Sequence, residues 1–279
     1  MADAPSEDLS ASAPASTVPD TFDTRVAHIA RVYDYWLGGK DNYAADRAAA
    51  EQVIAAYPTI RTSVRAQRAF LGRAVHYLAA DEGIRQFLDI GTGLPSANNT
   101  HEVAQRTAPD ARVVYVDKDP IVLSHARALL TGSPQGITAY LDADLRDTDA
   151  LLEQAEKTLD FSQPIAIMLL GVLHLISDQE DPWGIVAKLV DAVPSGSYLV
   201  ITHPASDLLP ETQGEASKRY NQNVATHQTL RTRAEVARFF DGLELLDPGM
   251  EQWHLWRPDP GDQPDADLKS GHAGVARKP

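Results

Sequence analysis

The spacing of apolar residues divides the chain into a helical part and an alternating part. Across residues 21–85 apolar side chains recur at helical spacing, as Val64 and Leu71 illustrate, with a break at the glycine pair 38–39. From residue 86 onward, short apolar runs alternate with amphipathic stretches of helical period. This change of period predicts a helical N-terminal segment followed by an α/β domain.

The apolar runs are predicted to be strands and the stretches between them helices. In order, the strand candidates are QFLDI, ARVVYVD, ITAYLDA, PIAIMLLGV and GSYLVIT. The first four are followed by the helix candidates THEVAQRTA, PIVLSHARALL, DTDALLEQAEKTL and PWGIVAKLVDAV. Strands that alternate with helices predict a doubly wound, mostly parallel sheet with helices on both faces. The run PIAIMLLGV is apolar on both alternating faces, which is typical of a buried central strand.

Three parts of different composition are predicted. Residues 1–20 are rich in Ala, Ser, Pro and Asp and are expected to form a disordered tail. Residues 21–85 form a helical N-terminal cap, and residues 86–279 form the α/β core. The core carries a polar helical insert near residues 206–230, which is followed by the helix candidate RTRAEVARFF and the strand candidates LELLDPG and AGVARK.

Composition narrows the function classes. Acidic residues outnumber basic ones by 39 to 25 among 279 residues, and the resulting net charge of −14 repels phosphate backbones and disfavours a nucleic-acid partner. Without cysteine there is no disulfide, thiolate metal site or cysteine nucleophile. No apolar run approaches the roughly 20 residues of a membrane span, and the N-terminus lacks a signal-peptide pattern. We therefore expect a cytoplasmic protein with no membrane partner and no bound metal.

The loop after the first predicted strand, in FLDIGTGLPSANNT, is a candidate ligand site. Gly91 and Gly93 directly after a strand allow a sharp turn and a close approach of a ligand to the main chain. A third glycine is missing, and Asn99 with Glu102 forms a capping pair that places the helix start several residues later. Since a diphosphate binds amides of a helix that begins at the glycines, a nucleoside without a pyrophosphate, such as S-adenosylmethionine, is favoured.

An acidic residue ends the second predicted strand. At the tip of RVVYVD, Asp117 is placed to accept hydrogen bonds from both hydroxyls of a ribose in this topology. The alternative is that Asp117 caps the next helix, although Asp119 and Pro120 already supply the features of a helix start.

The third predicted strand also ends in acidic residues, in YLDADLRD. Asp144 is a candidate to accept a hydrogen bond from an adenine amino group, with the main-chain N–H of Leu145 meeting a ring nitrogen. The alternative is a solvated acidic turn in which Asp147 or Asp149 caps the following helix.

A histidine follows the fourth predicted strand. The run GVLHLISD brings His174 to the carboxyl edge of the sheet, where open α/β folds place their chemistry. A histidine there can deprotonate an acceptor hydroxyl or amine, so His174 is the candidate catalytic residue. The alternative is a packed histidine that hydrogen-bonds the backbone.

The N-terminal segment VYDYWLGGKDNYAADR concentrates aromatic, glycine and polar residues. A glycine-hinged break between such helices is typical of a lid over a pocket. The alternative is a helix-turn-helix that packs its aromatic side chains on the sheet. Arg31, just before this segment, is a candidate partner for a cofactor carboxylate. The candidate lid and substrate residues are Tyr33, Tyr35, Trp36, Gly39 and Asn42.

Several motifs together resemble a known enzyme family. In order, FLDIGTGLPSANNT, VYVDKDPIVLSHARALL, ADLRD and LLGVLHLISD resemble the successive motifs of class I S-adenosylmethionine-dependent methyltransferases. More narrowly, VYDYWLGGKDNYAADR, GTGLPSANNTHEVAQ and the terminal GVARKP resemble an actinobacterial family of candidate methyltransferases formerly described as a domain of unknown function. The resemblance extends from about residue 23 to the C-terminus.

This resemblance implies a Rossmann-like sheet of seven strands whose last strand, AGVARK, runs antiparallel. It implies S-adenosylmethionine as the cofactor, with contacts at Gly91, Gly93, Asp117 and Asp144, and HLISD resembles the segment that carries the catalytic histidine of small-molecule O-methyltransferases. The full set of cofactor-binding candidates on these motifs is Gly91, Thr92, Gly93, Leu94, Asp117, Lys118, Asp144, Leu145 and Gly171.

The sequence therefore predicts S-adenosylmethionine-dependent methyl transfer to an oxygen or nitrogen atom of a small-molecule acceptor. One alternative is a non-catalytic protein that binds S-adenosylmethionine or S-adenosylhomocysteine. Another is a nicotinamide-dependent oxidoreductase on a related sheet. The identity of the acceptor and the oligomeric state stay open.

Overall fold

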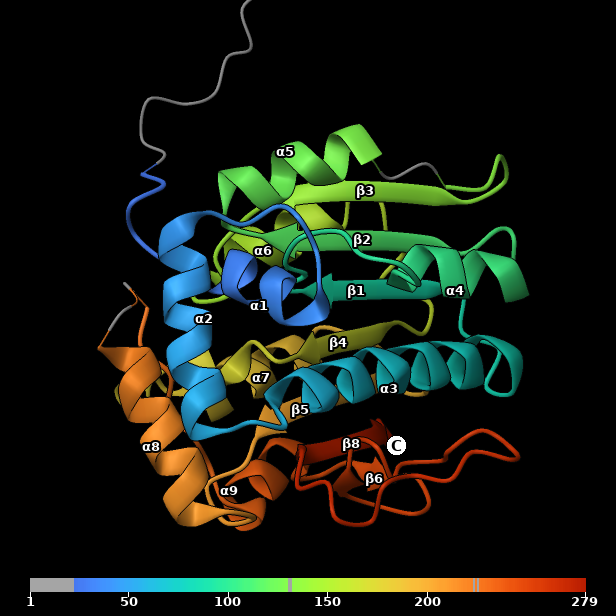
Figure 1. Cartoon of the computed structure of the whole chain (residues 1–279). Helices are drawn as coiled ribbons and strands as arrows, with labels where there is room; N and C mark the ends of the chain where they lie inside the picture. Colours follow the sequence, from blue (N-terminus) through green and yellow to red (C-terminus); the bar gives the residue numbers. More distant parts are fainter. Residues whose placement is uncertain (1–22, 130–131, 223, 225) are drawn as a thin grey trace, which may run out of the picture.

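A single twisted sheet forms the centre of the protein (Figure 1). The computed structural model describes residues 23–129, 132–222, 224 and 226–279, so the predicted tail over 1–20 lies outside the described residues. Within them the sheet has eight strands in the order β3-β2-β1-β4-β5-β8-β6, with β7 also paired to β8. Their bounds are β1 Gln86–Ile90, β2 Arg112–Asp117, β3 Ile137–Asp142, β4 Ala166–Leu170, β5 Tyr198–Pro204, β6 Glu244–Leu245, β7 Glu251–Gln252 and β8 Gly271–Arg277.

The predicted doubly wound, mostly parallel sheet is confirmed. Strands β1 to β5 pair in parallel, and β8 runs antiparallel to β5. The expected seventh strand position is split, because β6 and β7 both pair with β8 and are separated by residues 246–250. That connection contains Pro248, which has no N–H to donate to a ladder, and Gly249 at φ 87°. Eight short strands therefore fill seven positions.

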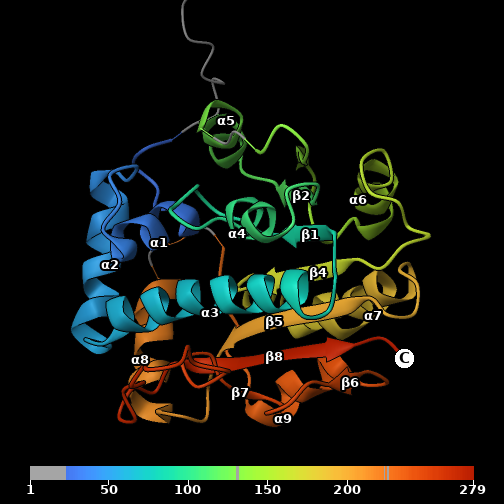
Figure 2. The same cartoon turned by 90° about the vertical axis from the view of Figure 1, so that its right-hand side faces the viewer.

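Alternation along the strands gives the sheet two apolar faces. On β1, Leu88 and Ile90 join one core cluster, whereas Phe87 joins the other. Helices α3 (Ile60–Ala80) and α4 (Thr100–Thr107) cover the Phe87 face. Helices α6 (Thr148–Ala155), α7 (Pro182–Asp191) and α9 (Arg233–Ala237) cover the opposite face, and Figure 2 shows the sheet between the two layers. The remaining helices of the core are α5 (Pro120–Leu129), η1 (Leu173–Leu175), η2 (Asp178–Glu180) and η3 (Arg238–Phe240).

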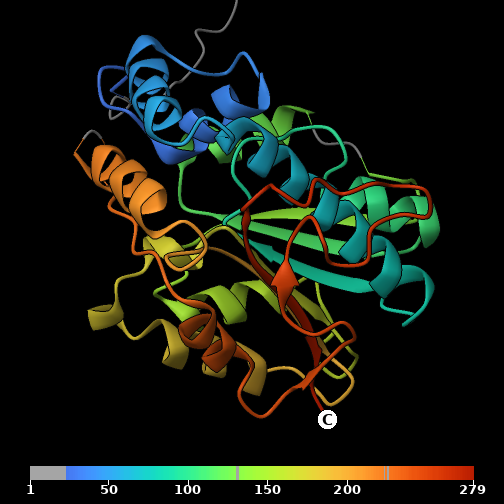
Figure 3. The same cartoon turned by 60° about the horizontal axis from the view of Figure 1, so that its bottom comes forward.

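The N-terminal helices and the polar insert form one cap at the carboxyl ends of the strands. Helices α1 (Ile29–Leu37) and α2 (Ala44–Ala56) precede α3, and the insert folds into α8 (Pro210–Asn221). In Figures 1 and 3, α8 lies beside α2, and the two helices are in contact. Apolar side chains of α1, α2 and α8 share one cluster that includes Val32, Val53 and Tyr220. Two segments far apart in the sequence thus build a common cover.

The predicted helix break at the glycine pair 38–39 is confirmed. Gly38 ends α1 in the left-handed region at φ 90°. A Cβ on Gly39 would lie 1.9 Å from a carboxylate oxygen of Asp34, so the turn requires glycine there. In the described part of the chain, no helix is both long and apolar enough to cross a membrane.

Candidate cofactor and acceptor site

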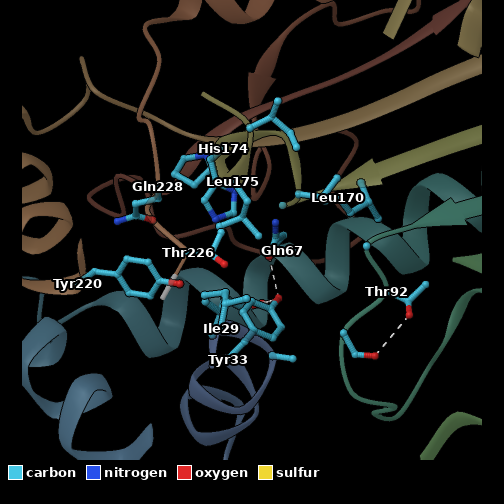
Figure 4. A pocket seen from close by; sticks show the side chains of 18 of the residues that line it. Ile29, Tyr33, Gln67, Thr92, Leu170, His174, Leu175, Tyr220, Thr226 and Gln228 are labelled. Carbon is cyan, nitrogen blue, oxygen red and sulfur yellow. Dashed lines mark hydrogen bonds between the residues drawn. The ribbon is translucent and has the colours of Figure 1, made fainter. Parts of the chain in front are cut away.

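A cavity of about 250 Å³ lies between the carboxyl edge of the sheet and the cap. Figure 4 shows Thr92 of the β1 loop at one end and Tyr220 of α8 at the other. His174 lies above the space between them, and Tyr33 lies below it. The cavity therefore joins the predicted cofactor loops to the cap, as expected from the position of the carboxyl ends of parallel strands.

The β1 loop leaves room for a ligand against its main chain. Gly91 and Gly93 have φ values of 75° and 64°, in the region that favours glycine. A Cβ on Gly91 would lie 2.5 Å from a methyl carbon of Val172, whereas a Cβ on Gly93 would meet no atom within 4 Å. Gly91 thus allows close packing under the loop, and Gly93 faces open space.

The helix after this loop begins late, as the capping pair predicts. Asn99 caps α4, which starts at Thr100, and the side chain of Glu102 accepts a hydrogen bond from the N–H of Asn99 at 3.0 Å. Six residues separate Gly93 from the start of α4. The glycines therefore do not lie at a helix N-terminus, which is the feature that a dinucleotide diphosphate requires.

Asp117 is a half-buried carboxylate at the end of β2 that lines the cavity. Its oxygens accept hydrogen bonds from the N–H groups of Gly93 at 3.0 Å and Asp119 at 2.9 Å. Burial raises the pKa of Asp117, and these two backbone hydrogen bonds oppose that rise. The helix cap is instead Asp119, which accepts a hydrogen bond from the N–H of Ile121 at 2.9 Å. Asp117 is thus held in place at the position predicted for a ribose contact.

Asp144 and Lys118 form an ion pair on the same rim, with 3.1 Å between Nζ and Oδ2. Partial burial acts to raise the pKa of Asp144, but hydrogen bonds from the Arg146 backbone and from Lys118 outweigh burial and lower it. The buried Leu145 follows in the cavity wall. Asp147 caps α6, which is the helix-capping role considered for it in the sequence.

Asp89 is a cavity residue that the sequence reasoning missed. It lies near the carboxyl end of β1, is 5% exposed, and accepts a hydrogen bond from the Thr100 hydroxyl at 2.6 Å. Burial raises its pKa to about 6, although the Thr100 hydrogen bond and the charge of Arg68 act against the rise. A carboxylate inside an otherwise apolar strand is the signal that would have identified it.

His174 lies on η1, directly after β4, and lines the cavity with 7% of its surface exposed. Burial, with a smaller contribution from the charge of Arg231, lowers its pKa to about 3. Its Nδ1 is buried and has no hydrogen-bond partner among the described residues. The imidazole is therefore neutral, and one of its nitrogens has no partner within the described protein.

Arg231, which the sequence reasoning also missed, holds the segment that carries His174. It is 1% exposed and donates to the carbonyl groups of Leu173 at 3.0 Å and Ile176 at 2.8 Å. It also pairs with Asp178 at 2.7 Å. These bonds fix the backbone on both sides of His174. An arginine near the end of the polar insert gave no local signal of this role.

Two predicted lid residues line the cavity. Tyr33 donates to Oε1 of Gln67 at 2.7 Å, and Nε2 of Gln67 donates to the Thr202 hydroxyl at 2.6 Å. Trp36 lines the cavity while its indole N–H donates to the carbonyl of Ala50 at 3.3 Å. The cap is thus attached through α1 and α3 to the end of β5.

The other predicted lid residues lie outside the cavity lining and stabilise the turn after α1 instead. The Tyr35 hydroxyl donates to Glu51 at 2.6 Å. Asn42 donates to Asp34 at 2.8 Å, and the Asp34 carboxylate occupies the space where a side chain on Gly39 would be. The helical face of α1, rather than the glycine turn, therefore points to the cavity.

Two further candidates serve packing. Leu94 is 9% exposed, does not line the cavity, and packs in a cluster with Ala30 and Val122. Arg31 pairs with the fully buried Asp46 at 2.8 Å, so its charge is engaged inside the cap rather than offered to a cofactor carboxylate. Besides Tyr33 and Trp36, the candidates that line the cavity are Gly91, Thr92, Gly93, Asp117, Lys118, Asp144, Leu145, Gly171 and His174.

The polar insert walls the far side of the cavity. Gln213 and Tyr220 of α8 line it, together with Thr226 and Gln228 of the segment that follows. The sequence left open whether the insert reaches the site, because the residue pattern of a polar helix does not predict which part of the protein it contacts. Across the described residues, no group of three or more His, Asp or Glu side chains is arranged to hold a metal ion.

The residues fit an adenosyl cofactor. The open space over Gly93 admits a ligand against the main chain, and carboxylates stand at the ends of β2 and β3. Lys118 and Arg146 engage Asp144 rather than forming a row of cations for a diphosphate. This donor set suits the hydroxyl groups and amino group of a nucleoside.

Comparisons with known proteins agree with this fit. The profile of the S-adenosyl methyltransferase family matches residues 15–279. A DUF574 family protein from Streptomyces avermitilis is 42% identical, with a TM-score of 0.88 over 92% of this chain and 99% of that one. A candidate methyltransferase from Thermobifida fusca is 44% identical, with a TM-score of 0.85 over 92% of this chain and 96% of that one.

A more distant structure shares the fold alone. The plantazolicin methyltransferase BpumL, solved with a desmethylplantazolicin analogue and S-adenosylhomocysteine, is 12% identical with a TM-score of 0.53, covering 90% of this chain and 96% of that one. No curated protein matches the chain.

Proposed function

The chain belongs to the S-adenosyl methyltransferase family, and from this premise we propose that it transfers a methyl group to an oxygen or nitrogen atom of a small-molecule acceptor. The cofactor is S-adenosylmethionine. When bound, it supplies an electrophilic methyl group on a sulfonium, and the products are the methylated acceptor, S-adenosylhomocysteine and a proton.

The observation that carries the proposal is one cavity with two differently built ends. The loops after β1, β2 and β3 supply glycine backbone and carboxylates at one end, and the cap and α8 supply the other. His174 lies between them. A cavity that only stored a nucleoside would have no need of this second, enclosed end.

Specific residues would hold the cofactor. Gly91 and Gly93 would offer main chain, and Asp117 would accept hydrogen bonds from the ribose hydroxyls. Asp144 would accept from the adenine amino group, and the Leu145 N–H would meet a ring nitrogen. The positions of these residues on one rim support the assignment.

His174 would receive the acceptor proton. Its Nδ1 has no partner among the described residues, and its low pKa keeps the imidazole unprotonated at neutral pH. The same low pKa makes it a weak base, so most of the acceleration would come from holding the acceptor in line at short distance. Proton removal would therefore assist the reaction rather than dominate it.

The cap would act as a lid that excludes water. A volume of about 250 Å³ is below the roughly 300–1,000 Å³ of pockets that hold a drug-sized ligand. Entry of cofactor and acceptor would therefore require outward movement of α1 or α8. The hydrogen-bonded connection from Tyr33 through Gln67 to Thr202 supports such a closed state.

The test compares ligands and then turnover. S-adenosylhomocysteine should raise the melting temperature, whereas NAD and NADP should not. Metabolite extracts incubated with labelled S-adenosylmethionine should then yield a labelled small molecule. Stabilisation by the nicotinamide cofactors alone would overturn the assignment. Binding of S-adenosylhomocysteine without transfer to any fraction would favour the non-catalytic alternative.

A further inference from the structure

The cap side of the cavity, here called the acceptor chamber, has a chemical character of its own. We define the chamber by six lining residues from the cap, α8 and the segments that pack on them: Trp36, Tyr57, Gln213, Tyr220, Gln228 and Trp253. The charges, aromatic surfaces and hydrogen-bonding groups of these side chains limit the kind of acceptor that can bind.

Charge is confined to the other side of the cavity. Its charged lining residues are Arg68, Asp89, Asp117, Lys118, Asp144 and Arg146. Five of them lie at β1 to β3 or just after these strands, and Arg68 donates to the backbone of Ala97 and Asn98 in the β1 loop. Among the described lining residues of α1, α2, α8 and the segment 226–230, there is no Asp, Glu, Lys or Arg. A charged acceptor would therefore lose water there without gaining a counter-ion.

The aromatic walls of the chamber present faces rather than polar groups. The Trp36 indole N–H is used by the carbonyl of Ala50 at 3.3 Å, and that of Trp253 by the carbonyl of Ser63 at 3.0 Å. The Tyr57 hydroxyl donates to the carbonyl of Lys269. With their polar atoms engaged inside the protein, these three rings are left to pack against a flat apolar ligand.

Two buried polar atoms at the chamber are not engaged. The hydroxyl of Tyr220 and Nδ1 of His174 have no hydrogen-bond partner within the described residues. Tyr220 is 1% exposed and His174 is 7% exposed. By contrast, Gln213 is satisfied by the Leu209 N–H at 3.1 Å and the Ser270 carbonyl at 3.3 Å. Buried polar groups without partners are rare, and a ligand is one way to satisfy them.

We propose that the chamber binds an uncharged aromatic acceptor with two polar groups, of which one faces His174 and is methylated and the other pairs with the hydroxyl of Tyr220. The proposal rests on the proposed function, because His174 marks the end at which transfer would take place. Tyr220 would then be the residue that selects acceptors by their second polar group. The flat aromatic walls would disfavour saturated, bulky acceptors. Charged acceptors would be disfavoured more strongly, because the chamber holds no counter-ion for them.

Fragment binding to the full chain saturated with S-adenosylhomocysteine tests the proposal. Four size-matched fragment sets are compared by ligand-observed NMR: neutral aromatic phenols and anilines, aromatic carboxylates, aromatic amines carrying an ammonium group, and neutral saturated alcohols. The neutral aromatic set should give a hit rate about tenfold above either charged set. Equal hit rates in a charged set, or no chamber-dependent hit in the neutral aromatic set, would overturn the proposal.

Paired variants show which hits occupy the chamber. Ser217 lines the cavity, whereas the neighbouring Lys218 on α8 is exposed and outside it. Ser217→Trp should abolish the hits, and Lys218→Trp should keep them. Tyr220→Phe should weaken fragments with two polar groups about fivefold and leave those with one unchanged. Tyr35→Phe, which removes a hydroxyl outside the cavity, should weaken neither. Equal affinities for Tyr220→Phe and wild type would also overturn the proposal.

The same experiment separates the two proposals. S-adenosylhomocysteine affinity is measured first for every variant. If the wild type fails to bind it, the proposed function fails. If S-adenosylhomocysteine binds normally but the fragment pattern is absent, only the acceptor class is wrong.

Discussion

The two ends of the cavity are built in different ways. The cofactor end consists of loops that directly follow β1, β2 and β3, and within each loop the lining residues are neighbours in sequence. The acceptor chamber is assembled from α1, the residue that follows α2, α8 with the segment after it, and Trp253, which are distant in sequence. The cofactor end can therefore be recognised from short sequence motifs, whereas the acceptor chamber forms only when the helices of the cap pack together.

The two ends also handle charge differently. Burial raises the pKa of Asp89 and of Asp117 at the cofactor end, so ionised carboxylates are held there against the cost of desolvation. The chamber lacks such groups within the described lining residues. Substitutions that remove a charge should thus alter cofactor binding, and substitutions that alter the shape of the chamber should alter acceptor binding. Four substitutions test how separate the two ends are.

The largest effect is expected for Asp46→Ala in the cap. The Asp46 carboxylate is fully buried and accepts hydrogen bonds from Arg31 at 2.8 Å and from the N–H of His28 at 2.9 Å. Its removal takes away the carboxylate that neutralises the buried Arg31 guanidinium, which still donates to the Val26 carbonyl, and should cost about 3–5 kcal/mol. Hydrogen exchange should show loss of protection in α1 and α2 but not in β1. Asp81→Ala, at an exposed carboxylate directly after α3, is the control, and equal loss in β1 would show that the cap and the sheet open together.

A smaller effect is expected for His174→Ala at the junction. Turnover should fall about 100-fold, at the low end of the range for acid–base catalysis because a base of such low pKa is weak. S-adenosylhomocysteine affinity should not change. Because the pKa of His174 is about 3, its protonation should not reduce the wild-type rate between about pH 5 and 8. The exposed His227→Ala is the control. Full activity of His174→Ala would make this histidine a packing residue.

Next comes Asp89→Asn at the cofactor end. Burial raises the folded pKa of Asp89 from 3.8 to about 6, so its ionisation opposes folding. As the pH rises from about 4 to about 6, the wild type should therefore lose roughly 2–3 kcal/mol of stability relative to Asp89→Asn, because only the wild type must ionise this buried group. Urea unfolding across this pH range measures the difference. Asp110→Asn, at an exposed carboxylate, should retain the wild-type slope, and a slope shared by all three proteins would contradict the prediction.

The smallest effect is expected for Asp117→Ala. Loss of the ribose contacts should weaken S-adenosylhomocysteine binding at least about tenfold, which is about 1.4 kcal/mol. Binding of neutral aromatic fragments in the chamber should persist. Calorimetry measures the first quantity, with Asp142→Ala on the exposed end of β3 as the matched control. Unchanged affinity would remove Asp117 from the ribose role.

Much of the fold followed from the sequence alone, because its signals are local. Short apolar runs located β1 to β5, and the glycine pair 38–39 located the break after α1. The Asn99–Glu102 pair fixed the start of α4, since a capping box joins residues only three positions apart. The family and its cofactor followed from motifs of the same local kind.

Tertiary structure decided the rest, because burial and pairing depend on what each residue packs against. Helical periodicity predicts which residues of α1 share a face, but it does not predict what each face contacts. In the structure Tyr33 and Trp36 line the cavity, whereas the Tyr35 hydroxyl donates to Glu51. Nor does periodicity pair Arg31 with Asp46. The sequence by itself predicted the loops that would bind the cofactor. Only the packing of α8 against the cap determined what encloses that side of the cavity, since those contacts join residues distant in the chain.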